Sequence, residues 1–133
     1  MITFDRISFN HFYTEIKNII PKEWFALINP ETQSFWKCEN VYYALTVGDG
    51  KIHINMIIEQ NQNNIQGLRG LIKQCKFWGI KTLTFGTASD NLRMQKLYKY
   101  IGATHLNTIK NAYGVGDSWE EYSLDLTTAK RFK

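Results

Sequence analysis

The first half of the chain contains short stretches in which apolar and polar residues alternate or β-branched and aromatic residues gather. Residues 2–7 place Ile2 and Phe4 on one face, as expected of a first strand. Residues 34–38, 41–47 and 51–59 have the same character, and Gly48-Asp49-Gly50 separates the last two stretches. This spacing predicts a meander of three strands.

A helical period separates the first strand from the meander. Apolar residues from Phe12 to Ile20 recur at helical spacing, behind Asn10, a residue type that favours the N-cap position. Pro21 is a suitable end for this helix, because the residue before a proline is disfavoured in helical conformation. Residues 24–27 are predicted to form a second short helix before Asn29-Pro30.

In the second half, helical and strand patterns alternate. Apolar residues from Ile65 to Cys75, followed by Trp78, mark one face of a helix that ends at Gly79. A short buried strand is predicted at residues 81–85. A helix and a strand thus follow the meander along the chain, and the strand is expected to extend the sheet that the meander begins.

A further helix follows, which Asp90 can cap and Gly102 can end. Two last strands are predicted near residues 103–108 and 119–126, joined by a glycine-containing loop at 113–117. No repeat, linker or low-complexity segment divides the sequence. We therefore expect one α/β domain over residues 1–133, a usual length for a single domain.

Composition agrees with an ordinary globular protein, since 44% of residues are hydrophobic and 21% are charged. The net charge of +4 favours a neutral or anionic partner but is too small to indicate a dedicated nucleic-acid binder. Cys38 and Cys75 belong to no metal-ligand cluster, and no metal site is visible. The sequence shows neither a signal peptide nor an apolar run of the ~20 residues that span a bilayer, so we expect a cytoplasmic protein.

The most specific pattern lies between residues 82 and 103. After a strand that reads TLTF, residues 91–103 read NLRMQKLYKYIGA. This segment resembles the GNAT superfamily of N-acetyltransferases, in which Asn, six residues, Tyr, three residues and Gly are commonly followed by an aromatic residue. Ala103 replaces that aromatic residue. The order of elements over nearly the whole chain is also similar to the GNAT order.

The resemblance implies an α/β (α+β) fold with a mixed, mostly antiparallel sheet of six to seven strands flanked by helices. It also implies acetyl-CoA, or another acyl-CoA, as co-substrate. In the family the residue matching Asn91 contacts the pantetheine arm near two splayed strands, and the residue matching Tyr98 donates a proton to the departing thiolate. A spacing of seven places both side chains on one helix face. A phenol can hydrogen-bond the sulfur as it gains charge.

The expected donor-binding loop departs from the GNAT pattern. GNAT proteins usually open the central helix with Arg or Gln, two residues, Gly, one residue, then Gly or Ala, so that bare amides cradle the pyrophosphate. Counting back from Gly79 places this loop at residues 59–64, which read EQNQNN. A later register would use Gln62 and Gly67, but it puts Ile65 where the first glycine belongs.

Asparagine tolerates left-handed backbone conformations better than most residues, so part of the phosphate cradle can survive without glycine. The side chains would still crowd the phosphates. The predicted donor-binding residues at this loop are Gln62, Asn63, Asn64 and Ile65, together with Asn91 at the next helix.

Glu59 at the end of the fourth strand is the first candidate for a general base, because a carboxylate there could take a proton from an ammonium acceptor through water. The alternative reading is an exposed carboxylate without catalytic role. His53 could relay a proton, and His105 has less support. Ser89 lies in no nucleophile motif, and an amine that attacks a thioester directly needs no covalent intermediate.

The leading hypothesis is transfer of an acetyl or other short acyl group from acyl-CoA to an amine on a small molecule or protein, with Tyr98 as general acid. A second hypothesis is a GNAT-fold protein without catalysis, acting as a binding or virion-associated phage component. A third is a nucleic-acid modifier similar to the phage adenine-modifying proteins of the superfamily, although nothing in the sequence indicates a base pocket. The acceptor and the oligomeric state stay open.

Overall fold

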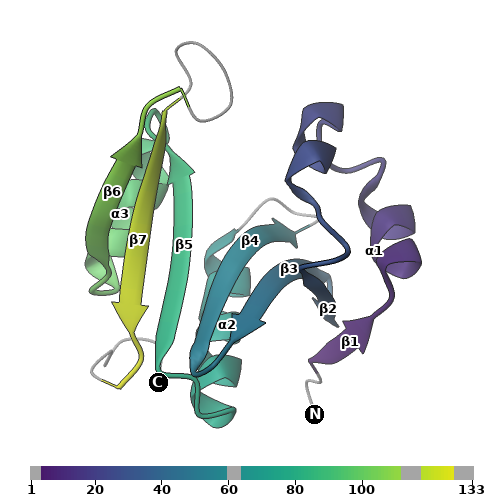
Figure 1. Cartoon of the computed structure of the whole chain (residues 1–133), viewed down its shortest axis with the longest axis horizontal. Helices are drawn as coiled ribbons and strands as arrows, with labels where there is room; N and C mark the ends of the chain where they lie inside the picture. The colour runs from purple at the N-terminus through teal and green to yellow at the C-terminus, as the bar shows by residue number, and fades with distance from the viewer. Residues whose placement is uncertain (1–3, 60–63, 112–117, 128–133) are drawn as a thin grey trace.

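A computed structural model describes residues 4–59, 64–111 and 118–127 of the chain. Helices lie on both faces of a seven-stranded sheet with the order β1-β2-β3-β4-β5-β7-β6 (Figure 1). The strands are β1 (Asp5–Ile7), β2 (Ser34–Cys38), β3 (Val41–Gly48), β4 (Lys51–Glu59), β5 (Thr82–Ala88), β6 (Thr104–Ile109) and β7 (Trp119–Asp125). The helices are α1 (Phe9–Ile16), the 3-10 helix η1 (Lys22–Leu27), α2 (Asn64–Phe77) and α3 (Leu92–Tyr100).

Strand pairing confirms the predicted fold class. β4 and β5 are parallel, whereas every other pair of neighbouring strands is antiparallel. The meander of β2, β3 and β4 is therefore present as predicted, and the sheet is mixed but mostly antiparallel. In the described part of the chain, no helix is both long and apolar enough to cross a bilayer.

Two hydrophobic cores cover the two faces of the sheet, because a strand sends alternate side chains to opposite faces. On one face lies the α2/α3 core: Tyr43, Leu45, Ile52, Ile54, Leu68, Leu71, Ile72, Cys75, Leu83, Phe85, Tyr98, Ile101, Tyr122, Leu124 and Leu126. On the other face lies the α1 core: Phe12, Ile16, Ile20, Phe35, Tyr42, Ala44, Met56 and Ile58. The helical periods seen in the sequence thus mark the faces that are buried.

The N-terminal elements differ from the prediction in their bounds. β1 begins at Asp5, and residues 1–3 lie outside the described residues. Ser8, not Asn10, caps α1, since its extended backbone lets the hydroxyl accept the amide of His11 at 3.0 Å. The helix ends at Ile16 instead of reaching Pro21, yet Ile20 is still buried, because a turn after the helix returns it to the α1 core.

The elements around β5 and α3 are also shifted from their predicted bounds. β5 continues to Ala88 because its antiparallel pairing with β7 extends to the pair Ala88 and Trp119. Asn91, not Asp90, caps α3, and its Oδ1 accepts the amide of Met94 at 3.2 Å. Gly102 follows the helix with φ of +91°, the left-handed conformation expected of a helix-ending glycine. The predicted loop at 113–117 lies outside the described residues.

Candidate functional site

The site begins where the two parallel strands separate. β4 and β5 pair only through Lys51 with Thr82, Ile52 with Leu83 and His53 with Thr84. Beyond these pairs the strands diverge toward α2 and α3 (Figure 1). We predict such a splay from the GNAT resemblance, and the pairing confirms it.

A β-bulge on β4 lies beside the point of separation. Ala44 pairs with Met56 and Leu45 pairs with Ile54, so Asn55 is an extra residue on β4. The side-chain Nδ2 of Asn55 donates a hydrogen bond to Thr46 Oγ1 at 2.7 Å, which holds the bulge against β3. A bulge bends its strand and changes which face the following residues occupy. It therefore contributes to turning β4 away from β5.

A cleft of about 900 Å³ occupies the wedge between the strands. Residues 54–57 of β4 and 85–88 of β5 form its walls, η1 contributes residues such as Trp24, and Trp119 of β7 lines it as well. Because the β4 to β5 ladder stops at His53 and Thr84, the facing strand edges beyond it can offer backbone N–H and C=O groups to a ligand. The cleft thus suits an extended ligand that contains amides.

Tyr98 of α3 lines this cleft and is only 6% exposed. Its hydroxyl donates to the carbonyl of Gly86 at 3.1 Å, two residues beyond the last β4 to β5 pair. The ring packs against Phe85 and Tyr122, with centroids 4.5 and 5.0 Å away. Burial, helped by the neighbouring Tyr122, raises the pKa of Tyr98 well above its ordinary value. The phenol therefore keeps its proton at neutral pH.

Asn91, the second residue of the predicted helix pair, also lines the cleft. Its side-chain oxygen is used to cap α3, which leaves the amide nitrogen as the donor group that it can offer to a ligand. The other predicted donor-binding residues belong to the start of α2 or precede it in the sequence. Gln62 and Asn63 lie outside the described residues, and Asn64 and Ile65 are the first two residues of α2.

Glu59 ends β4 as predicted, but its side chain is only 4% exposed and is no exposed strand-end carboxylate. It lies under α2, close to Gly67, and is not among the described residues that line the cleft. Burial raises the pKa of the Glu59 carboxyl. The nearby Gly67 amide offsets only part of that rise, since neither carboxylate oxygen makes a hydrogen bond of normal geometry to any described residue.

His53 occupies the last paired position of β4, where its Nδ1 lies 2.7 Å from Thr84 Oγ1. Burial lowers the pKa of His53, and the charge of Glu121 opposes that shift. His53 is absent from the described lining of the cleft. Its contact with Thr84 accounts for a structural role at the point where the two strands part.

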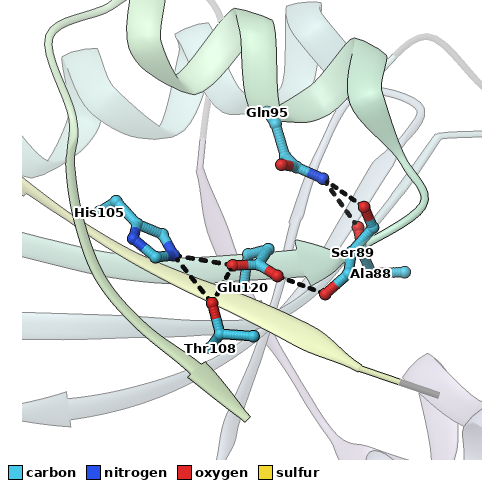
Figure 2. A network of polar contacts seen from close by, with 6 residues as sticks. All are labelled: Ala88, Ser89, Gln95, His105, Thr108 and Glu120. Carbon is cyan, nitrogen blue, oxygen red and sulfur yellow. Dashed lines mark hydrogen bonds and ion pairs between the residues drawn. The ribbon is translucent and has the colours of Figure 1, made fainter. Parts of the chain in front are cut away.

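The structure also assembles a polar network that the sequence does not reveal. Ser89, which lines the cleft, donates a hydrogen bond to Glu120 of β7, and Thr108 and His105 of β6 contact the same carboxylate (Figure 2). Gln95 of α3 holds the Ser89 carbonyl at 2.8 Å. One signal was available: Glu120 alternates with Tyr122 and Leu124, so an acidic residue shares the face of a core strand.

Comparison with known proteins supports the fold but not a particular activity. No protein-family model and no curated protein matches the sequence. Among solved structures, the ribosomal-protein-S18-alanine N-acetyltransferase from Escherichia coli matches with a TM-score of 0.70 at 16% identity, over 95% of this chain and 94% of that chain.

Two structures with bound ligands match with slightly lower TM-scores. A GNAT family acetyltransferase from Elizabethkingia anophelis with acetyl-CoA bound gives a TM-score of 0.67 at 16% identity, over 93% of this chain and 97% of the other. An acetyltransferase from Bacillus subtilis in complex with CoA gives 0.66 at 13% identity, over 94% and 99%. The chain therefore has the fold of the GNAT acetyltransferases, as its order of elements and its Asn-to-Gly helix segment predict.

Proposed function

We propose that this chain is an acyl-CoA-dependent N-acyltransferase that moves an acetyl or other short acyl group to an amine by direct attack. The observation that carries the proposal is the Tyr98 hydroxyl at Gly86, inside the wedge where β4 and β5 have just separated. A neutral phenol between the two separated strands suits a thioester donor. The strand edges can bind the amides of the pantetheine arm, and the phenol can donate a proton to the departing sulfur. Proteins of the same fold hold CoA or acetyl-CoA.

In the proposed step, the amine nitrogen attacks the thioester carbonyl carbon, so that a C–N bond forms and the C–S bond breaks. The electron pair of the C–S bond leaves on sulfur, and the Tyr98 hydroxyl exchanges its hydrogen bond to the Gly86 carbonyl for one to the departing thiolate, to which it donates its proton. Solvent then reprotonates the phenolate. Asn91, at the rim of the cleft, is proposed to hold the pantetheine arm with its amide nitrogen.

The proton that the amine loses needs an acceptor. Glu59 remains our proposal, and its raised pKa makes it a stronger base than an exposed glutamate. Since Glu59 does not line the cleft within the described residues, it can act only through an intervening water. The acceptor class is an amine on a small molecule or on a protein.

Coenzyme A titrated calorimetrically into the purified chain tests the proposal. We expect a submillimolar dissociation constant, because the cleft is open to the donor even though residues 59–64 contain no glycine. Absence of binding at millimolar coenzyme A would instead favour a GNAT-fold protein without catalysis. The glycine-free loop sequence is the one observation that supports this second function.

The same loop supplies a second test. Gln62 and Asn64 carry side chains where GNAT proteins usually have glycine, so the double change Gln62→Gly and Asn64→Gly should tighten coenzyme A binding. The change at Asn64, the first residue of α2, should cost roughly 0.5 kcal/mol of helix stability. Calorimetry and a denaturation curve measure the two effects. A variant that loses stability and still does not bind coenzyme A would support the non-catalytic reading.

A further inference from the structure

Ser89 lies in the turn between β5 and α3 and lines the cleft. Both of its backbone polar groups already have partners. The Ser89 N–H donates to the carbonyl of Ser118 at 3.0 Å, and the Ser89 carbonyl accepts from Gln95 Nε2 at 2.8 Å. The side-chain hydroxyl is therefore the group through which Ser89 can best contact a ligand.

The proton of that hydroxyl is also committed. Ser89 Oγ donates to Glu120 Oε2, and the other carboxylate oxygen accepts from Thr108 Oγ1 and lies 2.8 Å from His105 Nε2 (Figure 2). The hydrogen bond from Ser89, followed by that from Thr108, holds the pKa of Glu120 below its ordinary value. The carboxylate thus stays ionised at neutral pH, and an ionised carboxylate only accepts hydrogen bonds.

A hydroxyl has one donor and two acceptor lone pairs, so Ser89 Oγ can offer only lone pairs to the cleft. We propose that Ser89 Oγ accepts a hydrogen bond from an N–H group of the bound ligand, and that Glu120 is the positioning residue that fixes the hydroxyl in this orientation. The inference rests on the proposed function. Two groups of the reacting molecules have the required chemistry: an amide N–H of the pantetheine arm and the ammonium group of the acceptor.

The same geometry argues against Ser89 as a nucleophile. A serine nucleophile needs a base that removes its proton, and the usual arrangement places a histidine between serine and carboxylate. Here His105 contacts the carboxylate of Glu120 from the side of β6, and Ser89 bonds directly to that carboxylate. A carboxylate with a lowered pKa is a poor base for a hydroxyl.

The test uses the full chain and two probes, coenzyme A and benzylamine, each titrated calorimetrically. Ser89→Ala should weaken binding of one probe by about 3- to 10-fold, the usual effect of one net hydrogen bond. A loss confined to coenzyme A assigns the contact to the pantetheine amide, and a loss confined to benzylamine assigns it to the acceptor. Ser89→Thr keeps a hydroxyl and should restore the affinity.

Thr127→Ala is the matched control, because Thr127 Oγ1 also donates to a carboxylate, that of Asp125, but belongs neither to the Glu120 network nor to the described residues that line the cleft. It should leave both affinities unchanged. Glu120→Ala should weaken the same probe as Ser89→Ala, and the double variant should bind no more weakly than Ser89→Ala, since both changes act through one hydroxyl. Additive losses would overturn the positioning role.

Three outcomes separate this inference from the proposed function. Wild-type binding of coenzyme A together with unchanged affinities for both probes in Ser89→Ala overturns the inference alone. If the wild type binds neither coenzyme A nor benzylamine, the inference and the proposed function are overturned together. Denaturation curves of every variant show whether a loss of affinity comes from loss of the fold. A Ser89→Thr variant that folds but does not restore binding would show that the inference is wrong.

Discussion

Tyr98→Phe is expected to lower kcat by about 10²- to 10⁴-fold, the usual contribution of a general acid, while coenzyme A affinity is kept. The phenylalanine ring preserves the packing against Phe85 and Tyr122, and only the hydroxyl that bonds to Gly86 is lost. Without that proton, the thiolate must leave unaided. Steady-state turnover of acetyl-CoA with an amine acceptor measures kcat, and calorimetry measures donor binding.

Tyr100→Phe provides the control, because Tyr100 belongs to the same helix but is 60% exposed and does not line the described cleft. It should leave kcat unchanged. The dependence of kcat on pH gives an independent test. Because burial raises the pKa of Tyr98, the neutral acid persists to higher pH, and any loss of kcat from its ionisation should occur above the ordinary tyrosine value of about 10. Unchanged turnover in Tyr98→Phe would leave this residue a role in packing only.

The helices that flank the site follow from sequence because their burial repeats with a simple period. Leu68, Leu71, Ile72 and Cys75 recur at helical spacing and are all buried in the α2/α3 core. Cap positions are harder to predict when two capping residues stand close together. Asp90 and Asn91 both suit a cap, and the choice of Asn91 depends on how far β5 continues along β7.

The surroundings of Glu59 could not be predicted because a bulge changes the alternation of β4. Strict alternation from Ile52 and Ile54 would place Met56 and Ile58 on the same face. The extra residue Asn55 instead sends Met56 and Ile58 to the α1 core, and it turns Glu59 toward α2. No local pattern marks a bulge of this kind, since the bulge depends on the register with β3.

The contact between Ser89 and Glu120 lies beyond sequence reasoning for a different reason. The two residues are 31 positions apart, and they meet because β7 inserts between β5 and β6 in the sheet. The GNAT resemblance identifies only residues that occur in the family motif, such as Asn91 and Tyr98. It gives no information about a polar network that depends on strand order and on side chains outside the motif.

The close contact of α2 with the sheet leads to a large expected effect on stability. At Gly67, a Cβ would lie 2.9 Å from Glu59 Oε1, 2.9 Å from Ile57 Cγ2 and 3.0 Å from Val41 Cγ1. These distances are shorter than ordinary van der Waals contact, and the crowded atoms come from two paired strands. The Gly67 carbonyl also accepts a hydrogen bond from the Tyr43 hydroxyl at 2.8 Å, which holds α2 close to β3.

Gly67→Ala should therefore destabilise the chain by about 1 to 3 kcal/mol, the usual cost of overpacking, because the strain exceeds the gain in helix propensity. Gly70→Ala, one turn further along α2, is the matched control: its Cβ would meet only Tyr43 Oη at 3.7 Å, an ordinary contact. This variant should gain about 0.5 to 1 kcal/mol from helix propensity. Urea denaturation of both variants measures the difference, and equal stabilisation by the two alanines would show that α2 does not pack so closely. Because α2 begins directly beside the predicted donor loop, a displaced helix in Gly67→Ala should also weaken coenzyme A binding, whereas Gly70→Ala should not.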